Sequence, residues 1–318
     1  MRSLARKFVP CADEVFRLHK RKGVECDFFR GFCDEGHYGR NGANATRQGI
    51  YAVTPSGRFL ASVNTTDPKR MAAMLELALQ NWKGLGEGDR YLNPAPSGAQ
   101  FRSGRGEANY PTDGLVLRSF VRDLRKKGQR FADDWRGKAW NTDLAWFGKA
   151  EARRFLPADP KRGDKHTVPS NEFGRLVRFT FIDSVRGQTT PYAPGHVKDA
   201  KLVAEIVAVK NGRVELKFRG TVHTEAAGDW SVGGLRNGER SPQKRGFKGD
   251  VGGEAVYDLK AERFVAFRLV AVGTRWGGTR FNFRQDDLER APIGFVVQLA
   301  SDRPADTVAP AFWYAYGR

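Results

Sequence analysis

Three cysteines and one histidine near the N-terminus are the residues best suited to thiol or metal chemistry. They are Cys11, Cys26, Cys33 and His37. An odd, clustered set of cysteines argues against a disulfide framework. Zinc sites usually take ligand pairs from tight knuckles, whereas six residues separate Cys26 from Cys33 within an expected helix. The pattern favours buried thiols that pack like small apolar side chains, with a metal site as the alternative.

Cys11 is also a candidate for a lone reactive thiol. It precedes an expected helix start, where the helix dipole lowers the pKa of a thiol. We expect Phe8–Cys11 to be a short strand that ends at this residue, which argues against a catalytic position. Its exposure decides between a reactive and an inert thiol.

The other histidines and acidic residues form no recognisable catalytic pattern. His166, His196 and His223 lack the spacing of a Ser-His-Asp triad or a nucleophile elbow. The acidic pairs Asp133-Asp134 and Asp286-Asp287 are expected to be turn or helix-cap residues. We therefore expect neither catalytic residues nor a cofactor.

Arginine and aromatic residues alternate between residues 275 and 284. Surfaces that bind single-stranded nucleic acid interleave stacking rings with positive charge in this way. A strand with one apolar face produces the same alternation, and no RNP-type signature accompanies it. We therefore expect a strand over residues 279–283, with a nucleic-acid surface as the alternative. The residues concerned are Arg275, Trp276, Arg280, Phe281, Phe283 and Arg284.

The composition describes a folded and strongly basic protein. Fifty-four Lys and Arg against 36 Asp and Glu give a net charge of +18, which attracts nucleic acid, anionic lipid or acidic proteins. The basic residues are spread along the whole chain, which is typical of ordinary surface solvation. No window resembles a spanning helix, and residues 1–10 lack the apolar core of a signal peptide. The compartment stays open, with an extracytoplasmic location expected if a signal sequence lies upstream.

The first 84 residues show a recognisable order of elements. Thr54-Pro55-Ser56-Gly57 suits a type I turn between two apolar strands, and Asp67 can cap a helix that opens with Pro68. Phe28, Phe29 and Phe32 recur at helical spacing. We expect a strand at 8–11, helices over about 13–22 and 26–35, a hairpin over 48–64 and a helix over 68–83.

This order resembles the second half of bacterial thioredoxin-like proteins. The hairpin carries the resemblance, as Arg47-Gln48-Gly49-Ile50-Tyr51-Ala52-Val53, the turn at 54–57, and Arg58-Phe59-Leu60, followed by the Asp-Pro helix. The resemblance implies a sheet with a final helix packed on it, and it ends near Gly84. It says nothing about the remainder of the chain.

Two parts of the family's redox site are missing from this sequence. The family's Cys-x-x-Cys would lie before Met1, and its cis-proline is replaced in the segment Arg47, Gln48, Gly49 and Ile50. A cis bond without proline costs about 3 kcal/mol, so the usual kink is not expected. The resemblance implies a redox-inactive module with an open sheet edge, which another protein or a second copy could cover. Phe8 and Val9 are then expected to be buried only by another domain or chain.

The rest of the chain is expected to form a second, β-rich domain. Residues 87–111 contain Asn93-Pro94-Ala95-Pro96-Ser97-Gly98 and are interpreted as a linker. Asn211-Gly212 is the strongest hairpin signal. Residues 230–253 look like a glycine-rich loop, and residues 149–155 like a short helix. Strands are expected at 176–182, 201–209, 214–224, 254–259, 264–272, 279–283, 293–299 and 312–316.

The predicted fold class is therefore α+β. An incomplete thioredoxin-like α/β module covers residues 1–86, and a mainly antiparallel β sandwich or open barrel covers residues 112–318. The predicted function is a noncatalytic, two-domain protein that binds a partner protein or acts as an accessory module. One alternative is a thiol-disulfide oxidoreductase whose Cys-x-x-Cys lies upstream of Met1. The other is a basic protein that binds single-stranded nucleic acid.

Overall fold

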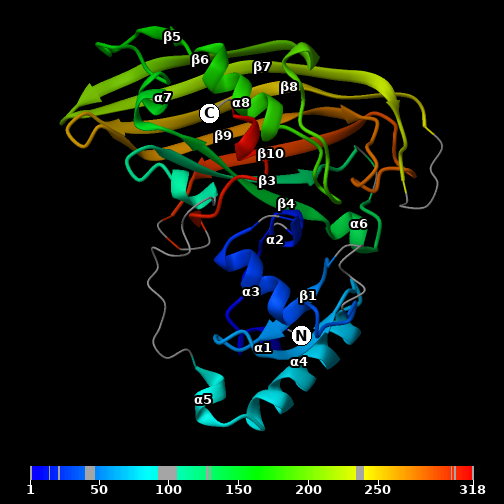
Figure 1. The fold of residues 1–318 in the computed structure, drawn as a ribbon. Helices are drawn as coiled ribbons and strands as arrows, with labels where there is room; N and C mark the ends of the chain where they lie inside the picture. The colour runs from blue at the N-terminus through cyan, green and yellow to red at the C-terminus, as the bar shows by residue number, and fades with distance from the viewer. Residues whose placement is uncertain are drawn as a thin grey trace. The chain divides into compact units, whose positions relative to one another are not determined.

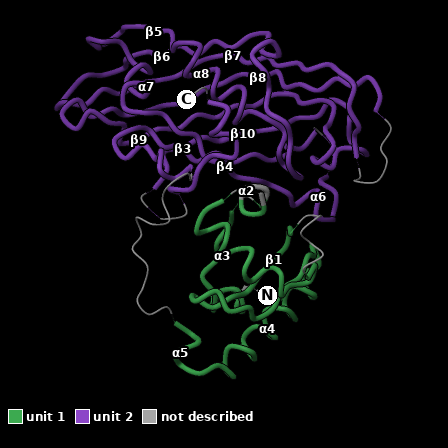
Figure 2. The backbone as a smooth tube through the Cα atoms, viewed as in Figure 1, with its two compact units in different colours: residues 1–104 green, residues 105–318 purple. Residues whose placement is uncertain are grey.

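The chain divides into two compact units, which are described separately (Figure 2). The computed structural model describes residues 2–13, 15–20, 22–39, 47–91, 106–126, 128, 130–233, 240–301, 303 and 306–316. Unit 1 covers residues 1–104 and unit 2 covers residues 105–318. The division falls inside the segment that the sequence suggests is a linker. Within that segment lie a short helix, α5 (Glu87–Arg90), and a 3-10 turn, η3 (Gly106–Asn109).

Unit 1 is a β-hairpin with one longer helix on each face. Strand β1 (Ile50–Val53) pairs antiparallel with β2 (Phe59–Val63). Helix α4 (Pro68–Lys83) packs on one face, and α3 (Val24–Cys33) packs on the other. Short helices α1 (Arg2–Ala5) and α2 (Val15–Lys20) complete the unit. The unit is therefore a small α/β part whose described sheet has two strands.

The hairpin turn and the start of α4 confirm two sequence predictions. The Gly57 N–H donates to the Thr54 carbonyl at 2.9 Å, and Gly57 has φ +85°, which glycine adopts at little cost. Asp67 caps α4 by accepting from the Lys69 N–H at 2.8 Å, and Pro68 occupies the first turn.

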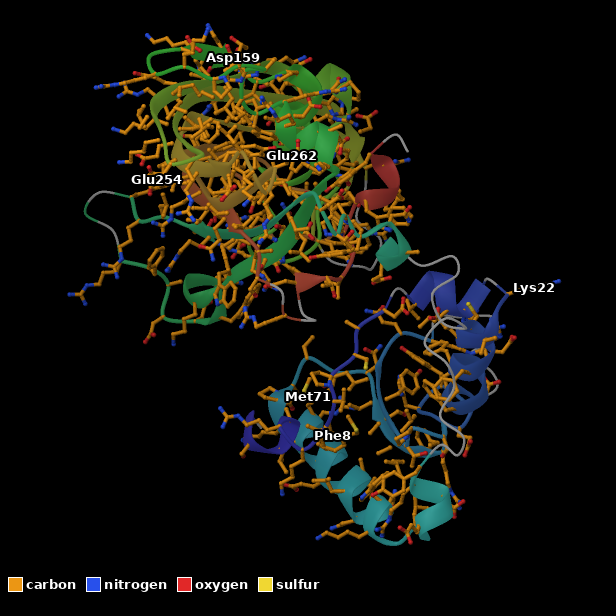
Figure 3. All side chains as sticks on the ribbon, turned by 90° about the vertical axis from the view of Figure 1, so that its left-hand side faces the viewer. Phe8, Lys22, Met71, Asp159, Glu254 and Glu262 are labelled. Carbon is orange, nitrogen blue, oxygen red and sulfur yellow. The ribbon has the colours of Figure 1, made fainter. Side chains whose placement is uncertain are left out.

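The strand expected at residues 8–11 is absent. Cys11 is exposed, and Val9 is 88% exposed within the chain, so the burial of Val9 by another domain or chain stays a prediction. Phe8 and Met71, both labelled in Figure 3, pack against the core beneath α4, so Phe8 is covered by its own unit. Pro10 has no N–H to donate to a neighbouring strand, and residues 8–11 pair with neither strand of the described β1–β2 sheet.

Unit 2 is built on one open antiparallel sheet of eight strands rather than on a sandwich of two sheets (Figure 1). The strands lie in the order β4-β3-β10-β9-β8-β7-β6-β5. Their bounds are β3 (Leu115–Asp123), β4 (Trp140–Phe147), β5 (Lys165–Thr167), β6 (Val197–Lys210), β7 (Arg213–Trp230), β8 (Ser241–Asp258), β9 (Arg263–Trp276) and β10 (Ala291–Leu299).

Helix α8 (Ser170–Phe179) lies against one face of this sheet and fills its inner side (Figure 1). Phe173, Leu176 and Val177 on α8 join buried side chains from the strands in a single core. Helix α7 (Lys149–Arg153) contributes Ala152 to the same core. Its Glu151 forms an ion pair at 2.5 Å with the buried Arg175 of α8, which allows a charged side chain to lie beside the core.

Both edges of the large sheet are protected from further pairing. Edge strand β5 has only three residues. Beside edge strand β4, the Ala311 N–H donates to Asp143 Oδ1 at 3.0 Å, and Ala309 and Tyr316 pack on Leu144 and Trp146. A short strand at one edge and a C-terminal segment at the other are common means of preventing unwanted strand addition.

Several element predictions hold and others are wrong. Asn211 and Gly212 both have positive φ and join β6 to β7, as predicted. Residues 176–182 belong largely to α8 instead of a strand, and residues 241–253 form most of β8 instead of a loop. The segments predicted as strands at 279–283 and 312–316 are a loop and a 3-10 turn, η6 (Trp313–Ala315). Within the described residues, no helix has the length and apolar character needed to cross a membrane.

The stability of unit 2 is expected to depend on pH through Asp143. Burial raises the pKa of Asp143 to about 6, although backbone N–H groups of Ala311 and Leu144 lower it. The folded state therefore binds this proton more tightly than the unfolded state, and the free energy of unfolding falls as the pH rises from about 4 to 6, by at most about 3 kcal/mol. Asp143→Asn should remove this contribution. Unfolding of both proteins at several pH values tests it, and identical pH dependence would contradict it.

Candidate functional site

A fully buried arginine joins three distant segments of unit 2. Arg284, on the loop between β9 and β10, is 0% exposed. It donates to both oxygens of Asp123 and to both oxygens of Asp183 at 2.7–2.9 Å, and to Asp287 at 3.0 Å. These five bonds match the five N–H groups of a guanidinium. Burial would lower the pKa of Arg284, but the charges and hydrogen bonds of Asp183 and Asp123 raise it.

Two further arginines complete this buried charge network. Arg275 is 1% exposed and donates to the carbonyl and the carboxylate of Asp287, while Arg186 donates to the same carboxylate at 2.8 Å. Burial would raise the pKa of Asp287, but hydrogen bonding to Arg275 and the three arginine charges lower it. Three arginines and three aspartates thus fix the end of β3, the loop after α8 and the loop from 277 to 290. The network consists of Asp123, Asp183, Arg186, Arg275, Arg284 and Asp287.

The network holds a loop that presents two phenylalanine rings to solvent. Asn282 is buried and accepts from the Thr279 N–H at 2.9 Å, whereas Phe281 and Phe283 are 41% and 46% exposed. Phe283 has φ +51°, a conformation that costs a bulky residue of order 1 kcal/mol and persists where surrounding contacts impose it. The loop lies directly on Gly187, where an added Cβ would come within 2.8 Å of the Phe283 ring.

A tryptophan and two arginines extend this exposed surface. Trp135, on the short helix α6 (Trp135–Lys138), is 52% exposed and meets Phe283 edge to face at 6.0 Å between ring centroids. The guanidinium of Arg280 lies 5.2 Å from the Phe281 ring, and that of Arg136 lies 5.7 Å from the Trp135 ring. We call Trp135, Arg136, Arg280, Phe281 and Phe283 the aromatic–arginine surface.

A second group of stacked cations lies close along the chain. Arg122 and Arg125 lie 5.4 and 5.1 Å from the ring of Phe131, four residues before Trp135. Exposed rings that are flanked by guanidinium groups can stack on flat, unsaturated groups and neutralise neighbouring anions. This combination suits binding better than chemistry, because no nucleophile with an adjacent base is part of it.

The six residues singled out between 275 and 284 separate into two groups. Arg280, Phe281 and Phe283 are exposed, whereas Arg275 and Arg284 are buried structural charges. Trp276 is nearly buried, with the Arg290 guanidinium 4.2 Å from its ring. Asp286-Asp287 was predicted to be a turn or helix-cap pair, which did not anticipate that Asp287 accepts hydrogen bonds from Arg186, Arg275 and Arg284. Sequence reasoning missed Trp135, because nothing local in the sequence links it to Phe283.

The N-terminal cysteines and His37 do not form a ligand set. Cys26 and Cys33 are buried, and Cys33 Sγ donates to the Arg30 carbonyl, while Cys11 is exposed. His37 lies within hydrogen-bond distance of Ser62 Oγ at 2.8 Å and of the Gln48 carbonyl at 3.2 Å. The described residues contain no group of three or more His, Cys, Asp or Glu side chains arranged to hold a metal ion.

The segment from Arg47 to Ile50 has a structural role. Arg47 is buried and pairs with Asp34 at 2.6 Å. Gly49 permits close packing, since an added Cβ would come 2.3 Å from the His37 ring. Gln48 supplies the carbonyl near His37, and Ile50 begins β1. These contacts anchor the hairpin to the loop after α3.

Arg284→Met should destabilise unit 2 by about 3–5 kcal/mol, because it leaves Asp123 and Asp183 buried without their counter-charge. Arg280→Met is the matched control, since the side chain of Arg280 is exposed, and it should change stability by less than about 0.5 kcal/mol. Chemical denaturation of both variants measures the difference. Equal stability of the two variants would show that the network does not hold the loop.

Thiol accessibility should separate the three cysteines. Cys11 should react with an aromatic disulfide reagent in the native protein, because it is exposed. Cys26 and Cys33 should react only after unfolding, since both are buried and burial raises the pKa of Cys33 to about 11. Peptide mapping after brief labelling identifies the modified thiol. Rapid native labelling of Cys33 would contradict the packing of α3 on the hairpin.

Comparisons with known proteins do not assign the chain to a family. The chain matches no protein-family model, no curated protein and no solved structure. The contacts, burial and charge described above are therefore the evidence for a role, and the resemblance of the N-terminal hairpin to thioredoxin-like proteins rests on the sequence pattern.

Proposed function

We propose that the chain is a noncatalytic binding protein and that its aromatic–arginine surface takes single-stranded nucleic acid. The observation that carries the proposal is the exposure of Phe281 and Phe283 on a loop whose alternate residues, Asn282 and Arg284, are buried and bonded. A loop with exposed aromatic residues normally loses stability by leaving apolar rings in water. Here the buried network of arginines and aspartates holds the loop in the conformation that exposes the two rings.

The chemistry of the surface fits a single strand better than a duplex. Every base has a flat face that can stack on Phe or Trp, and such stacking is worth about 1–3 kcal/mol per base. In a duplex those faces are already stacked on one another. Arg280 lies beside the ring of Phe281, where it can meet a phosphate, and the net charge of +18 favours a polyanion. Arg136, beside the Trp135 ring, is ion-paired with Asp134 and Asp286.

For unit 1 we keep the proposal of a partial thioredoxin-like module that binds a partner protein. Its support is the hairpin between α3 and α4, with the turn and the Asp-Pro helix start in the expected places. The two-stranded sheet leaves strand edges to which an extended segment could add. Cys11, Cys26 and Cys33 form no Cys-x-x-Cys pair in the sequence, which supports a role other than dithiol exchange.

Substituting the exposed rings should weaken binding of an oligothymidylate of about 15 nucleotides. Trp135→Ala and Phe283→Ala should each lower affinity by about 5- to 100-fold, because each removes a stacking platform. Fluorescence anisotropy at several salt concentrations measures both affinity and its salt dependence. A plot of the logarithm of the association constant against the logarithm of the salt concentration should be linear. Its slope should be about −0.7 for each phosphate that the protein contacts.

Tyr314→Ala is the matched control, since Tyr314 is an exposed aromatic residue outside the aromatic–arginine surface. It should bind as the wild type does. A hairpin duplex of the same length should bind more weakly than the single strand. Unchanged affinity of the Trp135 and Phe283 variants, or equal affinity for duplex and single strand, would refute the proposed function.

A further inference from the structure

We infer that the outer face of strands β8 and β9, opposite α8, is a docking surface for a second copy of this chain. This inference concerns other residues than the aromatic–arginine surface, which lies on α6 and the loop between β9 and β10, and it does not depend on nucleic-acid binding. Three observations carry it: an open groove, an alternating row of charges that are not paired within the described residues, and two exposed apolar side chains on β9, those of Val270 and Val272.

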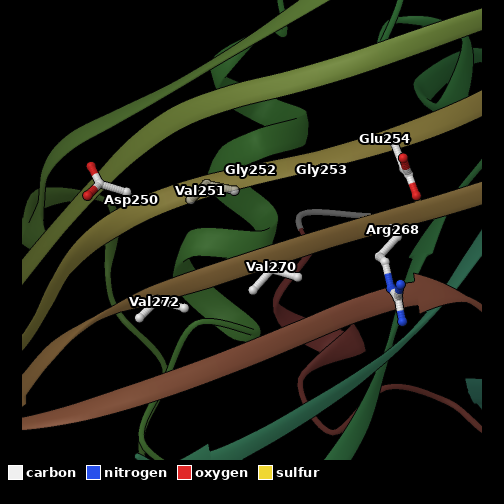
Figure 4. A pocket seen from close by; sticks show the side chains of 8 residues that line it. All are labelled: Asp250, Val251, Gly252, Gly253, Glu254, Arg268, Val270 and Val272. Atoms are coloured by element: carbon white, nitrogen blue, oxygen red, sulfur yellow. The ribbon is translucent and has the colours of Figure 1, made fainter.

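The groove has a volume of about 510 Å³ and lies over the glycines of β8 (Figure 4). Its walls include Glu254 on β8 and Arg268, Val270 and Val272 on β9. Gly252 leaves its floor open, because the nearest atom to an added Cβ would be 3.9 Å away. An inserted side chain could therefore occupy the space above Gly252 without displacing the strand.

Charges alternate in sign across five neighbouring strands beside this groove. Arg268 lies opposite Glu254, Glu254 opposite Lys217, Lys217 opposite Glu205, and Glu205 opposite Lys165. Opposite charges in such positions commonly pair across strands. In the part of the chain that the structure describes, none of these five forms an ion pair within 4.0 Å. Their charged ends remain available to a partner.

Apolar side chains lie opposite one another on β9, β10 and β3, in a row that starts at Val270, two residues after Arg268 on β9. Val270 lies opposite Val296 on β10, and Val296 lies opposite Phe120 on β3. Val270 and its neighbour Val272 are both among the exposed large apolar residues. The wet face of an antiparallel sheet is usually polar, so a run of apolar side chains there is typical of an interface.

A second copy is the partner that this pattern fits best. A two-fold axis along the strands, between β8 and β9, brings Arg268 of each copy against Glu254 of the other. The same axis places Val270 over Gly252, where the open floor can receive it. A uniformly acidic or basic partner would meet repulsion at every second charge. Self-complementary faces of this kind form isologous dimers, and sheets pack face to face at about 10 Å.

The test is the mass of the full-length chain by sedimentation equilibrium. The wild type should be a dimer, and Gly252→Val should be a monomer with half that mass, because the added side chain occupies the receiving space without an internal clash. Arg268→Glu and Glu254→Arg should each be monomeric, since each places like charges opposite one another. An equal mixture of these two variants should recover the dimer mass, because both interfacial pairs become opposite in sign again.

Several outcomes would overturn the inference. They are a monomeric wild type, variants that keep the wild-type mass, and charge variants whose mixture stays monomeric. Thermal unfolding and circular dichroism identify any variant that fails to fold. In that case the masses of the wild type and of Val270→Lys, an exposed position on the same groove, decide the question.

Discussion

The ion pairs of Arg284 with Asp123 and Asp183 are the contacts on which the candidate site depends. They join residues that are 161 and 101 positions apart in the chain. A buried guanidinium is tolerated only where its N–H groups are bonded, and here three carboxylates accept from all five. Arg275 and Arg186 balance the third carboxylate, Asp287. The loop therefore has one favoured position relative to β3 and to the segment after α8.

That position explains why an unfavourable backbone conformation and exposed rings can persist together. With Asn282 and Arg284 held inward, Phe281 and Phe283 must face outward, and Phe283 takes a positive φ. Rigid rings lose little conformational entropy when they bind, which favours recognition by stacking. The positive φ of Phe283 and the exposed rings cost stability, and the large core that α8 forms with the sheet offsets this cost. Stability in unit 2 thus supports the binding that we propose at its periphery.

Local signals in the sequence identified elements that depend on local geometry. The Asn211-Gly212 turn, the Asp67-Pro68 helix start and the hairpin of β1 and β2 were predictable, because their backbone conformations follow from residue type. Helix α8 was misread as a strand because it starts at Ser170 without a side-chain cap and its apolar residues run into residues 181–182. Strand β8 was misread as a loop because its glycines serve packing: an added Cβ at Gly246 would meet the Trp276 ring at 2.2 Å. The buried network was beyond prediction, since its partners are distant in the chain.

The most direct measurement is ultraviolet crosslinking of the full-length protein to an oligothymidylate, followed by mass spectrometry of the crosslinked peptides. Bases stacked on aromatic rings crosslink to those residues. The account predicts crosslinks at Trp135, Phe281 or Phe283, which disappear as salt is raised and the strand dissociates. Crosslinks confined to other parts of the chain, with none on the aromatic–arginine surface, would contradict it.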